Sequence, residues 1–230
     1  MRLVIVCCFC VCCLLAIAGC GDQVSTADLE RQIDARAPEF IGPAESCRTE
    51  IRGASANRIE EIRIVAVGVK PDPDQVVDPL QLTLKGVDIA QPFRIRRPGE
   101  VTFTARISES AVNAYLRRQQ RTDSGLLKNL RVQFQQGATR ISGSIAVMMV
   151  DIPFETTGTL KVAENMRLEY DEKTLRVIGV GLPAALPSLV THLVNPLADL
   201  SGLRFTPKIT KVTVEPGAVV LSGTAELRGL

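Results

Sequence analysis

The sequence predicts an α+β fold in which an antiparallel β-sheet packs against two or three helices. From Ile59 onward, several runs alternate apolar and polar residues with a period of two, which is typical of strands with one buried and one solvated face. Short polar turns such as Gln136-Gly137 separate neighbouring runs, and such turns favour antiparallel hairpins. Segments with helical spacing interrupt the strands, so we expect helices to cover a dry face of the sheet.

The alternating runs also identify which side chains face inward. Leu80, Leu82 and Leu84 alternate with polar residues, and the same pattern recurs over residues 101–107, 154–162 and 166–170. In a further run, residues 141–150, Ile145 lies on one apolar face. The opposite face is also apolar over the second half of this run. A strand that is apolar on both faces is either buried between layers or covered by another part of the molecule.

Three turns are predicted to join these strands: residues 136–137, 171–173 and 216–217. Residues 71–74 have the Pro and Asp content of a loop. Because no Pro-rich or Ser-rich linker divides the chain, we expect residues 26–230 to form a single domain.

Three segments have helical signals. Residues 26–33 form a short amphipathic pattern with Ser25 or Thr26 as its N-cap. Ser108 caps a second run that presents Ala111, Val112, Tyr115 and Leu116 on one stripe. The third helix is expected to start near Pro187 and end before Asn195-Pro196, with Leu189, Val190 and Leu193 on its apolar stripe.

A weak internal repeat aligns residues 132–143 with residues 212–223. Both segments read as strand, Gly turn and strand, with Ser-Gly at the same place. Duplicated hairpins in one sheet and convergent hairpin chemistry explain this pattern equally well.

The N-terminus has the pattern of a secretory signal. Residues 3–18 carry no charge, follow a single basic residue, and are too few to span about 30 Å of hydrocarbon. The run IAGC at residues 17–20 resembles the lipobox of bacterial lipoproteins. We expect residues 1–19 to be removed, Cys20 to carry lipid, and residues 20–25 to form a short tether to a membrane outside the cytoplasm. An uncleaved signal anchor or a coincidental cysteine is the alternative.

Composition excludes several kinds of function. Without Arg2 the 27 basic residues fall to 26, against 25 acidic ones, so the chain lacks the basic excess of nucleic-acid-binding proteins. Five of the seven cysteines lie in the leader and one is the proposed lipid site, which leaves Cys47 without a disulfide partner. We expect Cys47 to be a packed or idle thiol.

Catalytic and metal-binding patterns are missing from the sequence. His192 is the only histidine, and we expect it at the surface near a helix C-terminus. One histidine and one distant cysteine are a poor start for a metal site, and no phosphate loop, nucleophile elbow or HExxH run occurs. The sequence therefore favours a protein that is not an enzyme and needs no cofactor.

The C-terminal third resembles the LmeA family of bacterial phospholipid-binding envelope proteins. The resemblance is carried by LVNPLADLSGLRF at residues 193–205, ITKVTVEPG at 209–217 and LSG at 221–223. ISESAVNAYL at 107–116 and FIGPA at 40–44 also fit the family. Arg204 departs from it, since a proline before Phe205 is commoner there.

This resemblance implies an elongated, strongly curved antiparallel sheet with helices against it and an internal hydrophobic cavity for acyl chains. It supplies no catalytic residues. The function expected is non-catalytic binding or carriage of a phospholipid or other acyl lipid in the bacterial envelope, and the alternative is a structural or scaffolding lipoprotein with a filled core. The candidate cavity residues are Leu82, Leu84, Phe103, Ile145, Val147, Met149, Phe154, Leu160, Leu168, Leu189, Val190 and Leu193.

Overall fold

A computed structural model describes residues 25–55, 57–90, 94–122, 126–147, 150–163, 166–177, 190–192 and 194–227. The proposed signal peptide, Cys20 and most of the third predicted helix lie outside these ranges. None of the helices in the described ranges is long and apolar enough to cross a membrane.

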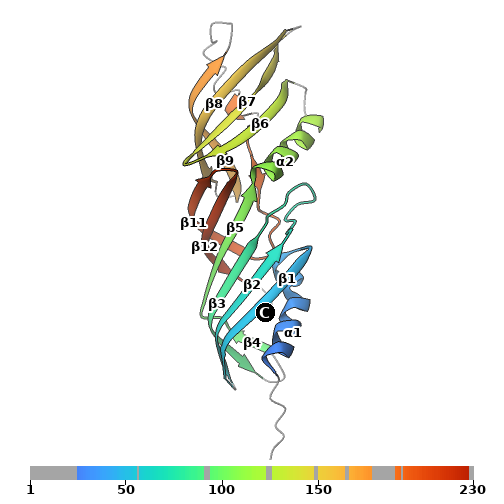
Figure 1. The fold of residues 1–230 in the computed structure, drawn as a ribbon, viewed down its shortest axis with the longest axis vertical. Coiled ribbons are helices and arrows are strands. Elements are labelled where there is room, and N and C mark those ends of the chain that lie inside the picture. The colour runs from blue at the N-terminus through green and yellow to red at the C-terminus, as the bar shows by residue number, and fades with distance from the viewer. Residues whose placement is uncertain are drawn as a thin grey trace, which may run out of the picture.

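Two curled antiparallel sheets follow one another along the long axis of the molecule (Figure 1). The seven-stranded sheet has the order β1-β2-β3-β5-β12-β11, with β4 paired to β3. The five-stranded sheet has the order β10-β9-β8-β7-β6. The first contains β1 (Ser46–Ala54), β2 (Arg58–Val67), β3 (Leu80–Ala90), β4 (Arg94–Arg97), β5 (Glu100–Ser108), β11 (Thr206–Glu215) and β12 (Ala218–Glu226). The second contains β6 (Leu127–Gln135), β7 (Ala138–Val147), β8 (Val150–Val162), β9 (Arg167–Val177) and β10 (Ala198–Asp199).

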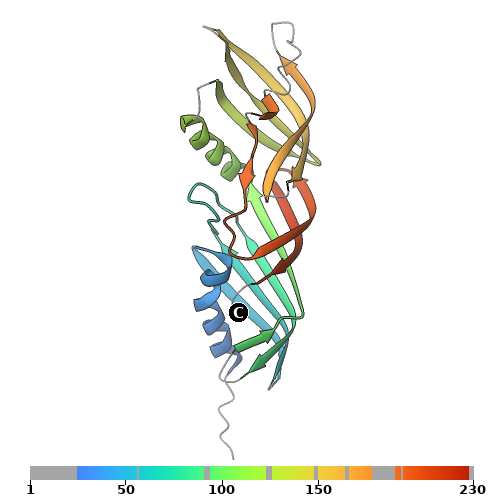
Figure 2. The ribbon, with the colours of Figure 1, turned by 180° about the vertical axis from the view of Figure 1, so that it is seen from behind.

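One helix packs beside each sheet, as the view from behind also shows (Figure 2). Helix α1 (Thr26–Ile41) lies along β1 and α2 (Glu109–Thr122) lies along β6. Residues 190–192 and 194 are also helical, at the end of the third predicted helix. The prediction of an α+β fold with a strongly curved antiparallel sheet and helices against it is confirmed.

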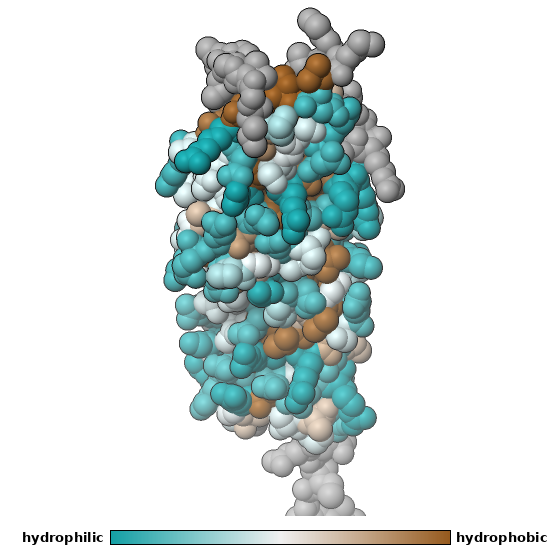
Figure 3. All heavy atoms as spheres, turned by 45° about the horizontal axis from the view of Figure 1, so that its top comes forward, coloured by the Kyte–Doolittle hydropathy of each residue, from teal (hydrophilic) through white to brown (hydrophobic). Residues whose placement is uncertain are grey.

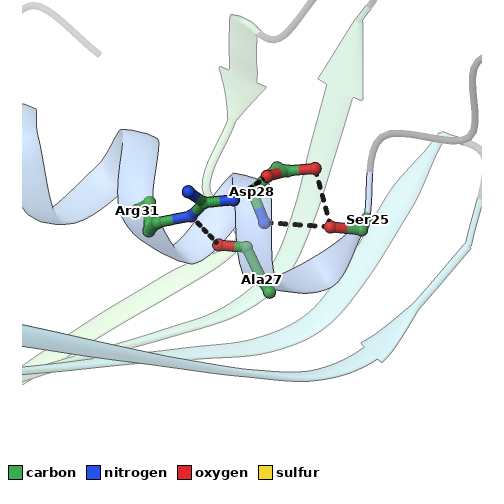
Figure 4. A network of polar contacts seen from close by, with 4 residues as sticks. All are labelled: Ser25, Ala27, Asp28 and Arg31. Carbon is green, nitrogen blue, oxygen red and sulfur yellow. Dashed lines mark hydrogen bonds and ion pairs between the residues drawn. The ribbon is translucent and has the colours of Figure 1, made fainter.

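Helix α1 begins where the sequence predicted and continues further. The Ser25 hydroxyl accepts the N–H of Asp28 at 3.2 Å, and Arg31 then pairs with Asp28 and donates to the Ala27 carbonyl (Figure 4). The apolar stripe that starts at Leu29 and Ile33 runs on past residue 33, and the helix ends only at Gly42, whose φ is 102°.

Two of the three predicted hairpin turns are confirmed. Residues 136–137 join β6 to β7, and residues 216–217 join β11 to β12. The predicted turn at 171–173 is wrong, because β9 runs through it without a break. The pairing with β8 shifts there, so that Thr157 faces Thr174 and Gly158 faces Glu172, which makes the polar residues a β-bulge.

The repeated hairpins meet at the junction of the two sheets. The N–H of Gly137 donates to the Val214 carbonyl at 3.0 Å, and the N–H of Gly217 donates to the Phe134 carbonyl at 3.2 Å. The hairpins lie in different sheets, so the alternative of duplicated hairpins in one sheet is wrong. Each turn supplies a reciprocal backbone bond that holds the sheets end to end.

Polar side chains from the two helices and from Asn195, just after the helical residue 194, bond to strand edges in both sheets. The Asn113 side chain of α2 accepts the N–H of Val132 at 2.8 Å and donates to the carbonyl of Val132 at 2.9 Å. Asn195 makes the same pair of bonds with Tyr170 of β9, at 2.7 and 3.0 Å. Glu30 of α1 accepts the N–H of Ile51 at 2.9 Å. These bonds satisfy strand groups that would otherwise be free at an edge.

We predict that Asn113→Ala and Asn195→Ala each lower the free energy of unfolding by about 1–3 kcal/mol, because each leaves a partly buried N–H and C=O without a partner. Urea denaturation of the purified protein measures this. Asn57→Ala, at an exposed position, is the matched control and should change stability by no more than about 0.5 kcal/mol. Equal stability of all three variants would contradict the prediction.

Candidate functional site

The inner faces of the two sheets hold most of the predicted cavity residues. Leu82, Leu84 and Phe103 are buried in the seven-stranded sheet. Ile145, Phe154 and Leu168 are buried in the five-stranded sheet with Val190, and Leu160 is partly buried. The side chains of Val147, Met149, Leu189 and Leu193 lie outside the described residues. The candidate residues therefore divide between the two sheets, within one continuous cluster of buried apolar side chains.

A narrow cleft lies between α1 and the inner face of the seven-stranded sheet. Its lining residues are Gln32, Ile33, Arg36 and Phe40 from the helix and Ile62, Ile64, Leu84 and Ile95 from β2, β3 and β4. The floor is entirely aliphatic, whereas Gln32 and Arg36 supply polar groups from the helix side. The cleft volume is about 20 Å³, which is room for roughly one or two water molecules.

Of these lining residues, only Leu84 is among the cavity residues predicted from the sequence. The signal for the others was present: Ile33 and Phe40 continue the apolar stripe of α1, and Ile62 and Ile64 alternate along β2. What the sequence could not supply was the pairing that places β2, β3 and β4 opposite α1.

The C-terminal run that resembles the LmeA family passes between the two sheets. Leu197, Leu200, Leu203 and Phe205 are all buried, and the Phe205 ring lies 5.7 Å from that of Phe103. Arg204 points away from this core and donates to the Pro38 carbonyl of α1 at 3.4 Å. The run therefore links the end of the five-stranded sheet to the helix that covers the other sheet.

The interior is close-packed where this run crosses. The space lined by Gln75, Tyr115 and Leu197 measures about 10 Å³. The Gln75 side-chain carbonyl accepts the N–H of Asp199 at 2.9 Å. The described residues leave only this small space where the crossing run meets α2.

Two buried polar side chains of the five-stranded sheet bond to each other. The Thr156 hydroxyl donates to the Thr174 carbonyl at 2.9 Å and accepts from the Tyr170 hydroxyl at 2.8 Å. Burial raises the pKa of Tyr170 to about 12, so the phenol stays neutral. Burial also raises the pKa of the Cys47 thiol, and the Asp34 carboxylate adds to this effect, which disfavours a reactive thiolate.

No three side chains of His, Cys, Asp or Glu gather into a possible metal site within the described part of the chain. His192 is exposed, as predicted. What the described interior offers is aliphatic surface.

The pKa of Asp199 gives a test of the crossing run. Burial by itself raises this pKa, but hydrogen bonds from the hydroxyl and N–H of Ser201 and the Arg167 guanidinium outweigh it, so the net shift is downward from 3.8. A lowered pKa stabilises the fold above the ordinary value and is lost as the pH falls through the folded value. We predict that Asp199→Asn lowers the free energy of unfolding at pH 7 and has a smaller effect near pH 3.

Urea denaturation at several pH values measures this dependence. Asp88→Asn, which removes an exposed carboxylate 3.8 Å from Arg58, is the control and should have little effect at either pH. An Asp199→Asn penalty that does not change with pH would contradict the assignment.

Comparison with known proteins places these features in a family. No curated protein and no solved structure matches the chain. The model of the LmeA-like phospholipid-binding family matches residues 50–224, which include both sheets from β1 to β12 and the buried crossing run. The match covers most of the chain, in agreement with the resemblance found in the sequence, and the chain belongs to the LmeA-like phospholipid-binding family.

Proposed function

We propose that this protein is a lipid-anchored, non-catalytic phospholipid carrier of a bacterial envelope. The observation that carries the proposal is the cleft beneath α1, which combines an aliphatic floor with polar groups from one helix. Membership of a phospholipid-binding family supplies the ligand class.

The cleft suits an acyl chain that enters as α1 moves outward. Each CH₂ group that leaves water favours binding by about 0.8 kcal/mol, so an aliphatic wall holds a chain without specific chemistry. Arg36 is half-exposed and pairs with Glu39 at 3.4 Å, a weak surface contact that a phosphate could replace. Guanidinium groups bind phosphate oxygens in a bidentate manner, and Gln32, one helical turn away, adds a further donor.

The proposed tether places this cleft near a membrane. Cys20 precedes Ser25 by five residues, which span at most about 18 Å when extended. Ser25 caps the start of α1, at the lower end of the molecule in Figure 1. A lipid on Cys20 would hold the α1 end of the protein close to the bilayer.

A structural lipoprotein with a filled core is the second candidate. The specific observation in its favour is the small volume of the cleft, about 20 Å³. The two candidates differ in whether purified protein contains phospholipid, which native mass spectrometry measures directly.

We predict that Ile95→Trp lowers the amount of bound phospholipid with at most about 1–3 kcal/mol loss of stability, because the larger ring fills the cleft before it strains the core. Lys85→Trp, at an exposed position of the neighbouring strand, is the matched control and should keep its lipid. Native mass spectrometry gives the lipid content, and circular dichroism confirms the fold. Wild-type protein that purifies without lipid would favour the structural candidate instead.

We predict that Cys20→Ala releases the protein from the membrane fraction or leaves its signal uncleaved, because the tether is the proposed anchor. Fractionation and the mass of the N-terminus measure both outcomes. A conservative control is Cys47→Ala, which should leave processing and membrane attachment unchanged. A Cys20→Ala protein that is still cleaved and still membrane-bound would refute the anchor.

A further inference from the structure

The inner face of the five-stranded sheet opens to solvent at the end of the molecule farthest from the start of α1. Phe154, Ile152 and Val150 follow one another on the inner face of β8 as the strand approaches this end. Phe154 is 2% exposed, Ile152 is intermediate and Val150 is 63% exposed. The apolar face that is buried near the junction therefore emerges at the far end.

Apolar side chains of neighbouring strands lie at the same end of the sheet. Ile152 pairs across the strands with the buried Ile145, so the exposed and buried parts of the inner face are in contact. Leu126, which is 40% exposed, lies at this end on the opposite face, because its carbonyl accepts the N–H of Ala146 at 2.8 Å and Ala146 pairs with Asp151. We call Leu126, Val150 and Ile152 the distal rim. Figure 3 turns this end toward the viewer and shows apolar residues gathered there.

The charges beside the distal rim neutralise one another. The Lys128 ammonium lies 2.8 Å from the Asp151 carboxylate, across the strand between them. Val67, at 37% exposed, is the other large apolar side chain exposed among the described residues, and it lies on β2 of the other sheet. The distal rim thus combines apolar exposure with local charge balance.

We propose that the distal rim is a contact surface for a phospholipid bilayer, through which acyl chains reach the inner face of the five-stranded sheet. This inference rests on the proposed lipid-carrying function. The strip from Val150 to Phe154 is continuous with the apolar interior, so a chain that leaves a bilayer at the rim stays on apolar surface along its path.

The size and position of the rim favour a bilayer over a protein partner. A stable protein interface requires about 20–30 residues a side, and the rim offers three apolar side chains among the described residues. A bilayer accepts a small apolar insertion. The start of α1, to which the proposed tether would be joined, lies at the opposite end of the long axis (Figure 1). The rim is thus placed to meet a second lipid surface.

The test uses the mature lipoprotein reconstituted in one set of labelled vesicles. A second set, made of phosphatidylglycerol and phosphatidylethanolamine, reports tethering through energy transfer between the two labels. We expect the Leu126→Asp/Val150→Asp double variant to lose roughly tenfold or more of the tethering, because charged groups replace the apolar contact. Val67→Asp, the matched control at an exposed apolar position away from the rim, should tether like the wild type.

Two further measurements separate the possible outcomes. Circular dichroism checks the fold, and Val150→Ser alone provides a milder variant that should show a smaller loss. Native mass spectrometry reports bound phospholipid in each variant, so a wild type that tethers but contains no lipid refutes the carrier function and not the contact surface. Wild-type protein that does not tether, or a folded double variant that tethers normally, overturns the proposal, as does tethering that requires a protein partner on the second vesicle.

Discussion

Closure of the sheet edges by polar side chains is the constraint on which this structure depends. A short curled sheet presents free N–H and C=O groups along its outer strands, and such edges pair readily with other chains. Here Asn113 bonds both backbone groups of Val132, Asn195 does the same for Tyr170, and Glu30 accepts from Ile51. Each helix is thereby fixed over an apolar face, so one set of contacts both protects the edge and closes the interior.

The described interior is mostly apolar, with a few buried polar groups. Thr156 and Tyr170 bond to one another and to a backbone carbonyl, whereas Thr49, Gln75 and Thr139 each have a buried side-chain atom without a partner among the described residues. The raised pKa values of Tyr170 and Cys47 keep both groups in their neutral forms. Around them are aliphatic side chains, whose contribution to ligand binding is removal of acyl chains from water.

The interior is expected to open at the helix that makes the fewest hydrogen bonds to its sheet. Helix α2 is held to β6 by both backbone bonds of Asn113 and by Glu109, which accepts the N–H of Phe134 at 2.9 Å. Among the described residues, helix α1 has one such bond, from Ile51 to Glu30, and the Arg204 contact at its C-terminal end is long, at 3.4 Å. The cleft lies under α1. The helix with fewer polar contacts to its sheet is therefore the one beneath which the proposed acyl site lies.

The sequence by itself determined the fold class, the faces of most strands, the caps of α1 and α2, and the family, because these follow from periodicity, local hydrogen-bonding chemistry and a contiguous motif. The run over residues 141–150 was the exception, since β7 ends at Val147 and Val150 begins β8. It predicted Leu84 and Phe103 as inward-facing because alternation reports the face of a strand. Tertiary structure alone decided that β9 passes through residues 171–173 as a bulge. The polar residues there are compatible with a turn and also with a strand whose pairing shifts opposite Gly158. It likewise decided that the repeated hairpins meet from different sheets, and that Ile33, Phe40 and Ile95 enclose one cleft. These features depend on pairing between distant segments, which local patterns do not encode.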